Sequence, residues 1–224
     1  MSTLFVVATP IGNLEDLSLR ARKILSTVPI VLAEDTRRTR VLLAHLSAHP
    51  TLASYHQHTI KTKRDQLLSY LETSDVALVT DAGTPGISDP GGLFIEEALR
   101  RFGSSLSIVP IPGPSALATT ASISGFPMDA FLFLGYPPHK KGRKTFFDRV
   151  AATHDAVIFY EAPHRIQKAL RELSLRIPQR LLVVCRELTK HFETVYRGSA
   201  EELAVSLGNE KPRGEYTVVV APER

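Results

Sequence analysis

The sequence predicts an α/β protein with two lobes, each built on a mostly parallel sheet covered by helices. Short aliphatic and β-branched runs alternate with longer segments of helical period, the order that builds parallel sheets through crossover helices. The runs show little polar alternation, as in strands whose sheet is covered on both faces. A proline-rich segment, Pro110-Ile-Pro-Gly-Pro114, separates two such series. It indicates either a hinge between lobes or a rigid loop inside one domain.

The first series, residues 1–112, forms the expected N-terminal lobe. Strands are expected at 4–8, 30–33, 76–80 and 106–110, and helices at 17–28, 36–46, 61–71 and 93–102. The second series, residues 113–224, forms the expected C-terminal lobe. Here an apolar helix follows Ser115, strands are expected at 130–134, 157–160, 181–185 and 216–221, and further helices at 142–152, 165–176 and 200–207.

The composition is that of an ordinary globular protein in a reducing compartment. Of the 224 residues 43% are hydrophobic and 22% charged, and the single Cys185 cannot form an internal disulfide. No basic segment precedes the apolar residues 4–8 and no long apolar stretch follows, so we expect neither export nor membrane insertion. The expected location is the cytoplasm. The formal charge of +4 is too modest to indicate a nucleic-acid partner by itself.

The loop 81–92 is the most informative of the segments that follow strands. It holds four glycines and two prolines, and glycine is expected where the backbone approaches a ligand or takes a positive φ. Asp81 and Asp89 are its only charges, which favours a neutral or cationic ligand over a phosphate. A long rigid surface loop is the alternative. The glycine patterns of phosphate-binding loops and of dinucleotide-binding folds are absent from the sequence.

Three more segments follow expected strands with unusual residues. Pro10 and Gly12 fix a turn after the first strand, which either approaches a ligand or simply connects two elements. Ser115 either caps a helix or contacts a ligand. The segment 159–165 delivers Tyr160, Glu161, His164 and Arg165 in quick succession, which favours a functional role.

Seven motifs in this order make the sequence resemble a known family. They are Thr-Pro-Ile-Gly-Asn-Leu14, Ala-Glu-Asp-Thr-Arg37, Ser-Tyr-His-Gln-His58, Asp-Ala-Gly-Thr-Pro-Gly-Ile-Ser-Asp-Pro-Gly91, Pro-Gly-Pro-Ser-Ala116, Phe-Tyr-Glu-Ala-Pro-His-Arg165 and Arg-Glu-Leu-Thr-Lys190. Together they resemble the bacterial small-subunit ribosomal RNA (cytidine-2′-O)-methyltransferases, a branch of the tetrapyrrole methylase superfamily. Many members of that superfamily have a richer glycine loop after the first strand. Here only Gly12 remains, which favours the RNA-modifying branch.

The resemblance implies a homodimer of two-lobed α/β subunits, with S-adenosylmethionine in a cleft between the lobes and ribosomal RNA, or the small ribosomal subunit, as partner. Carried over by position, the cofactor contacts are Pro10, Gly83, Thr84, Pro85, Ile87, Asp89, Ser115, Ala116, Tyr160, Arg186, Gly214 and Thr217. The resembled enzymes often continue into a small helical extension, whereas this sequence stops at Arg224.

A ribose 2′-hydroxyl attacks a methyl group well only when a base removes its proton. Asp35, Glu161 and Lys190 are the candidates, because each follows an expected strand. The alternative for each is a structural ion pair, such as Asp35 with Arg37 or Glu187 with Lys190.

Basic clusters suit phosphate contacts, although solvated helix faces carry similar charges. The candidates for RNA binding are Arg37, Arg38, His56, Lys140, Lys141, Arg143, His164 and Arg165. His56 and His58 supply at most half a metal site, so no metal is expected. An unpaired, splayed-out nucleotide is the expected acceptor, and the sequence does not identify it. The alternatives are a tetrapyrrole carbon methyltransferase and a non-catalytic RNA-binding protein.

Overall fold

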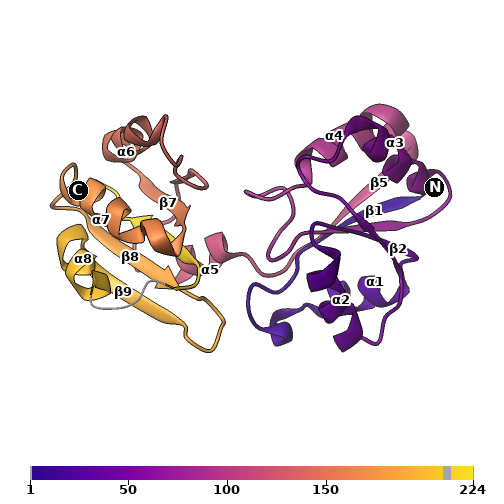
Figure 1. Ribbon diagram of the computed structural model, residues 1–224, viewed down its shortest axis with the longest axis horizontal. Helices are drawn as coiled ribbons and strands as arrows, with labels where there is room; N and C mark the ends of the chain where they lie inside the picture. The colour runs from indigo at the N-terminus through magenta and orange to yellow at the C-terminus, as the bar shows by residue number, and fades with distance from the viewer. Residues whose placement is uncertain (1, 209–212, 224) are drawn as a thin grey trace. The chain divides into compact units, whose positions relative to one another are not determined.

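The computed structural model describes residues 2–208 and 213–223 and divides the chain into two compact units. The units are Met1–Ser115 and Ala116–Arg224, whereas the sequence analysis placed the boundary after Pro112. Each unit carries its own sheet and helices (Figure 1). No helix in the described part of the chain is both long and apolar enough to span a bilayer.

The N-terminal unit is built on a five-stranded sheet in which every pairing is parallel, as expected. Its strands are β1 (Thr3–Val7), β2 (Ile30–Ala33), β3 (Thr51–Ser54), β4 (Val76–Val79) and β5 (Ser107–Ile111), in the order β3-β2-β4-β1-β5. β2 and β4 are buried along their whole length, because helices cover both faces of the sheet.

Two apolar clusters on opposite faces hold this unit together (Figure 1). The covering helices are α1 (Leu19–Thr27), α2 (Thr36–His45), α3 (Lys61–Ser69) and α4 (Gly92–Phe102). Leu25 of α1 and Leu42 of α2 pack on one face, and Leu67 of α3 and Phe94 of α4 pack on the other. Two of these helices begin at a side-chain cap: the Ser18 side chain accepts a hydrogen bond from the Ala21 N–H at the start of α1, and the Asp35 side chain accepts one from the Arg37 N–H at the start of α2.

The C-terminal unit has a mixed sheet, so the expectation of a mostly parallel sheet is wrong for its strand pairings. The strands are β6 (Phe131–Phe133), β7 (Ala156–Glu161), β8 (Leu181–Arg186), β9 (Thr194–Ser199) and β10 (Tyr216–Val220), in the order β6-β7-β10-β8-β9. Only β6 and β7 pair in parallel. The crossover from β7 to β8 leaves room for one strand, and β10 fills it antiparallel to both neighbours. A connection without a helix then brings β9 back beside β8.

Helices cover this sheet as well. They are α5 (Ala116–Ile123), α6 (Arg143–Ala152), α7 (Ile166–Ser174) and α8 (Ala200–Gly208). Phe147, Leu170 and Leu203 from α6, α7 and α8 pack into one cluster with β7, β8 and β10. α5 contacts β7 and β10, and the buried Cys185 lies beside its Thr120. Burial raises the pKa of the Cys185 thiol.

A two-pronged ion pair joins α3 to α4 in the N-terminal unit. Arg64 donates from Nε and Nη2 to the two carboxylate oxygens of Glu97, at 2.8 and 2.9 Å, and both side chains are largely buried. Its hydrogen bonds hold the pKa of Glu97 below its usual value. The pair therefore stabilises the folded state while the carboxylate is ionised.

We expect Glu97→Gln to lower the free energy of unfolding by about 1–3 kcal/mol at neutral pH, because one charged hydrogen bond is lost in a poorly hydrated place. Since the folded-state pKa of Glu97 lies below the unfolded value of 4.5, the contribution is complete above that value. It disappears as the pH falls through the folded-state pKa. Urea unfolding of wild type and variant across this range measures the difference.

The matched control is Glu96→Gln on the same helix, whose exposed pair with Arg100 should contribute at most about 1 kcal/mol. Equal effects of the two substitutions, or a Glu97 effect that persists unchanged in acid, would contradict the assignment.

Candidate active site

The loops that follow β1, β4 and β5 are joined by backbone hydrogen bonds. Because these strands are parallel, their carboxyl ends lie at one edge of the sheet, where ligands bind in open α/β sheets. The Thr9 N–H donates to the Gly83 carbonyl at 2.9 Å, and the Gly83 N–H donates to the Thr9 carbonyl at 3.0 Å. The Ala8 N–H donates to the Ile111 carbonyl at 3.1 Å. The three loops therefore form one rigid surface.

Glycine is required at the contacts between these loops. A Cβ on Gly113 would lie 3.1 Å from the Ala8 Cβ, and Gly83 has a φ of +79°. The Thr84 hydroxyl donates to the Pro114 carbonyl at 3.3 Å, which fixes the glycine loop against the segment after β5. A side chain at Gly113 would push the loops apart, and one at Gly83 would be strained by the positive φ.

The rest of the glycine loop folds on itself. The Gly86 N–H donates to the Pro90 carbonyl at 3.2 Å, and a Cβ on Gly91 would approach the Gly86 nitrogen to 3.2 Å. Ser88 has a positive φ of 60°, a conformation that is strained for a residue with a side chain. Pro10 belongs to the loop after β1, which is part of the joined surface. The loop after β4, which is also part of it, contains five of the expected cofactor residues: Gly83, Thr84, Pro85, Ile87 and Asp89.

Three of the expected cofactor residues come together in the C-terminal unit. Thr217 pairs with Tyr160 across the β10–β7 ladder, and its neighbour Tyr216 pairs with Arg186 across the β10–β8 ladder. The Tyr160 ring contacts the ring of Tyr136, with centroids 5.4 Å apart. The sequence places these residues far apart, and the insertion of β10 between β7 and β8 brings them together.

Asp35 caps α2 and forms a fork with Arg37. One carboxylate oxygen accepts from the Arg37 backbone N–H at 2.8 Å and from its Nε at 3.0 Å, and the other accepts from Nη2 at 2.6 Å. These hydrogen bonds, the side-chain ones first, hold the pKa of Asp35 far below its usual value. A carboxylate so stabilised is a weak base, so the geometry favours the structural alternative for Asp35.

Glu161, at the end of β7, is 1% exposed and ion-paired on both oxygens. Arg143 Nη1 lies 3.0 Å from one oxygen and Arg165 Nε lies 2.9 Å from the other. Arg143 is itself buried and also pairs with Glu172 at 2.8 Å. This network stabilises the interior of the C-terminal unit, and it commits Arg143 and Arg165 to carboxylates rather than to solvent.

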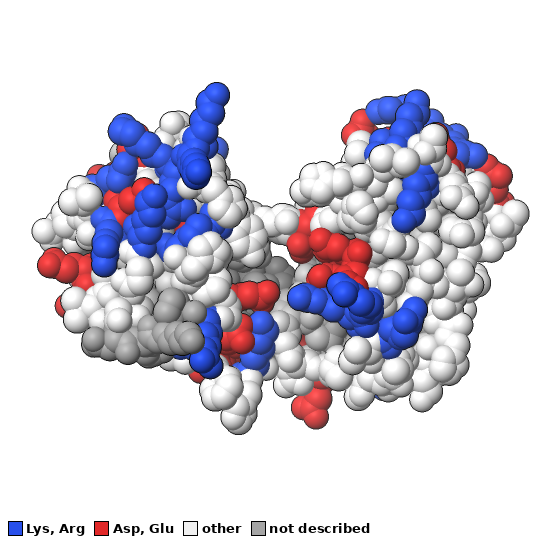
Figure 2. All heavy atoms as spheres, in the orientation of Figure 1, with Lys and Arg blue, Asp and Glu red and all other residues white. Residues whose placement is uncertain are grey.

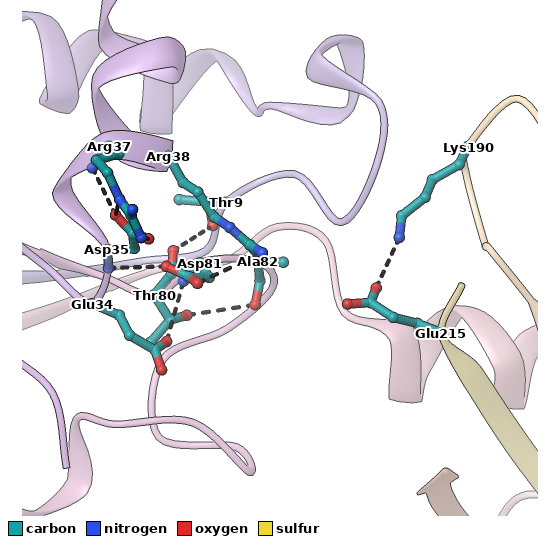
Figure 3. A network of polar contacts seen from close by, with 10 residues as sticks. All are labelled: Thr9, Glu34, Asp35, Arg37, Arg38, Thr80, Asp81, Ala82, Lys190 and Glu215. Carbon is teal, nitrogen blue, oxygen red and sulfur yellow. Dashed lines mark hydrogen bonds and ion pairs between the residues drawn. The ribbon is translucent and has the colours of Figure 1, made fainter. Parts of the chain in front are cut away.

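Lys190 is held by two carboxylates on a strained turn after β8. Its Nζ lies 2.8 Å from Glu187 and 2.9 Å from Glu215, and Figure 3 shows the second of these contacts. Burial alone would lower the pKa of Lys190, but these hydrogen bonds outweigh it and the pKa is raised. Glu187 and Thr189 have positive φ values of 52° and 63°, and a Cβ on Gly214 would overlap the Glu187 side chain. Lys190 is therefore a persistent cation and a poor proton acceptor.

The sequence analysis did not single out Glu34, although it lies in the motif that contains Asp35. Glu34 follows β2 directly, and its Oε2 accepts only a long hydrogen bond, 3.4 Å, from the Asp81 N–H (Figure 3). Burial raises the pKa of Glu34, and the Asp81 N–H offsets this only in part. A half-buried carboxylate with a raised pKa suits a general base better than Asp35 does. Its position right after a buried strand was the available signal.

Most of the expected RNA contacts are exposed. Arg37, Arg38, His56, Lys140, Lys141 and His164 reach solvent, whereas Arg143 and Arg165 do not. Figure 2 shows Lys and Arg side chains gathered over the part of the C-terminal unit that carries α6 and α7, and a mixed group of both charges near the start of α2. The described residues contain no group of three His, Cys, Asp or Glu side chains arranged to hold a metal ion.

Comparison with known proteins places the chain in a family. The family model described as "Tetrapyrrole (Corrin/Porphyrin) Methylases" matches residues 3–204. The chain is 40% identical to "Ribosomal RNA small subunit methyltransferase I" of Thermotoga maritima, covering 99% of each chain. It is 44% identical to the protein of the same name from Xylella fastidiosa, covering 97% of this chain and 81% of that one.

A solved structure shares the fold. The uroporphyrin-III-C-methyltransferase of Thermus thermophilus superposes with a TM-score of 0.65 at 22% identity, covering 99% of this chain and 94% of that chain. The expected α/β fold of this superfamily is confirmed, and the chain belongs to the tetrapyrrole methylase family.

Proposed function

We propose that this chain transfers the methyl group of S-adenosylmethionine to the 2′-hydroxyl of a cytidine in small-subunit ribosomal RNA. The observation that carries the proposal is the joined surface of loops after β1, β4 and β5, built from the motifs that the sequence shares with ribosomal RNA methyltransferases. The names of relatives about 40% identical along nearly the whole chain support this substrate class.

The joined surface fits a sulfonium cofactor in two respects. Gly83 and Gly113 keep the backbone free of side chains where a Cβ would crowd the neighbouring loop or require strain. The loop 81–92 carries carboxylates and no Lys or Arg, so it repels phosphate and tolerates a positively charged ligand. When bound, the cofactor supplies a methyl group that is already activated.

This chain's residues must then orient the acceptor oxygen in line with that methyl group, which is where most of the rate enhancement arises. We infer that Glu34 takes the proton of the 2′-hydroxyl, because its carboxylate is held less tightly than those of Asp35 and Glu161. Lys190, as a fixed cation, is suited to stabilising negative charge on the RNA rather than to removing a proton.

The small ribosomal subunit is the proposed partner. Lys140 and Lys141, which are exposed before α6, are the proposed phosphate contacts. Tyr160, Arg186, Gly214, Thr217 and Ala116 are the proposed cofactor contacts of the C-terminal unit, and Ser115, the last residue of the N-terminal unit, is another proposed contact. A homodimer stays a prediction from the resemblance, and a cytoplasmic location stays a prediction from the composition of the sequence.

We expect Gly113→Ala to weaken S-adenosylmethionine binding at least several-fold, because the new methyl group must displace Ala8 and with it the loop after β1. Isothermal calorimetry measures the affinity. Gly208→Ala is the control, since among the described residues its Cβ would come within 4 Å of the Gln167 amide alone, at 3.9 Å. Wild-type affinity in Gly113→Ala would contradict the role of the joined loops.

We expect Glu34→Gln to lower kcat by about 10²–10⁴-fold while S-adenosylmethionine affinity stays unchanged, since the amide cannot accept the proton. In wild type, kcat should rise with pH as the carboxyl ionises and level off above the pKa of Glu34. Burial raises this pKa above 4.5, and the negative charge of Asp81 raises it further. The charges of Arg38 and His56 lower it but do not cancel the rise. The pH profile of kcat for the variant should lack this rise to a plateau.

Glu96→Gln, an exposed carboxylate on α4, is the control for this substitution. Asp35→Ala, Glu161→Gln and Lys190→Ala test the other candidates in the same assay. Near-normal turnover in Glu34→Gln would exclude Glu34 as the base, and near-normal turnover in all four variants would remove a protein base from the mechanism.

We expect the double change Lys140→Ala and Lys141→Ala to weaken binding of small ribosomal subunits and to leave cofactor affinity intact. If both side chains contact phosphates, the slope of log affinity against log salt should fall by about 1–2. Arg22→Ala with Lys23→Ala, two exposed charges on α1, is the control. An unchanged slope would place the RNA elsewhere on the chain.

A further inference from the structure

A small hollow opens in the N-terminal unit beside the joined loops. It has a volume of about 120 Å³ and lies where the carboxyl ends of β1 and β4 meet α2. This is well below the ~300–1,000 Å³ of sites that enclose a whole cofactor-sized ligand. It is room for a single planar ring, such as one pyrimidine base.

The wall of the hollow has an apolar part and a polar part. Pro10, Leu14, Val41 and Leu42 supply the apolar part, and Thr9, Arg38, Thr39, Thr80 and Asp81 supply the rest. Val41 is 66% exposed and Leu14 is 37% exposed, so two apolar side chains border the hollow without being covered by the unit's own core. An unstacked base buries its faces against such side chains, and proteins that recognise single-stranded RNA provide surfaces of this kind.

The rim carries one carboxylate and one guanidinium side by side. Asp81 Oδ1 accepts from the Asp35 N–H at 3.0 Å, which fixes the carboxylate, and Oδ2 faces Arg38 Nη1 at 3.3 Å (Figure 3). The Arg38 side chain is 65% exposed. An exposed ion pair of this kind contributes little stability, so a ligand can share both groups at small cost.

We propose that this hollow binds the base of the acceptor nucleotide and that Asp81 and Arg38 select cytosine. Cytosine presents an amino donor at the position where uracil presents a carbonyl acceptor, and a carboxylate accepts from that amino group. Arg38 then donates to the acceptor atoms beside it. This inference rests on the proposed methyl transfer to RNA and adds the part of the site that reads the base.

The test uses small ribosomal subunits from cells that lack this protein. After wild-type enzyme has identified the acceptor nucleotide, a second set of subunits carries uridine in its place. Wild type should prefer the cytidine substrate by about tenfold or more in kcat/KM. In Asp81→Asn the amide oxygen can still accept from the Asp35 N–H, while the amide nitrogen places a hydrogen-bond donor in the hollow. The ratio of kcat/KM for the cytidine substrate to that for the uridine substrate should therefore fall at least about tenfold.

A second variant tests the hollow independently, in case Asp81→Asn does not fold correctly. Val41→Trp fills the hollow from an exposed position, and it should raise KM for the subunits without changing S-adenosylmethionine affinity. Leu19→Trp, at an apolar site at the start of α1 that is 84% exposed, should behave as wild type.

The outcomes separate the two proposals. No methyl transfer to subunits by wild type overturns the proposed function, and the inference with it. Methyl transfer by wild type together with an unchanged base preference in Asp81→Asn, or a loss of S-adenosylmethionine affinity in Val41→Trp, overturns the assignment of the hollow alone.

Discussion

The reciprocal backbone hydrogen bond between Thr9 and Gly83 is the constraint on which the rest of the site depends. It ties the loop after β1 to the loop after β4, and these two strands are neighbours in the centre of the sheet. Backbone bonds need no particular side chain, but they do need the close approach that Gly83 and Gly113 permit. A rigid, charge-poor surface follows at the edge where parallel strands end, and it lies beside the hollow and beside Glu34 and Asp35, which precede α2.

The three candidate carboxylates differ in how strongly hydrogen bonds and ion pairs hold them. The Asp35 carboxylate accepts hydrogen bonds from the backbone N–H and from the guanidinium group of Arg37. The Glu161 carboxylate forms ion pairs with the guanidinium groups of Arg143 and Arg165. Both are held in place by these contacts and contribute mainly structure. Glu34 receives a long hydrogen bond and lies half-buried, so burial raises its pKa, whereas the hydrogen bonds from Arg37 lower the pKa of Asp35. This contrast separates a group that can exchange a proton from groups that position the chain.

The sequence was informative where one short segment decides its own environment. The apolar runs that form β1, β2, β4 and β5, and the helices between them, could be predicted because the hydrophobic pattern is a local property of the sequence. The edge strands β3 and β9 were missed, since Thr51–Ser54 is short and half-exposed and Thr194–Ser199 includes Arg197 and Gly198. The pairing of β10 between β7 and β8 is a long-range choice that no local pattern encodes.

The candidate site shows the same division. The glycine loop could be predicted because glycine density is visible in the sequence, whereas the burial of Arg143 depends on α6 packing over Glu161.

The most direct test of the proposed methyl transfer offers methyl-labelled S-adenosylmethionine to the protein together with purified small ribosomal subunits and tetrapyrrole precursors, and measures which acceptor becomes labelled. We expect label in the RNA alone, recovered after digestion as 2′-O-methylcytidine. Label in the tetrapyrrole, on an RNA base carbon, or in neither acceptor would contradict it.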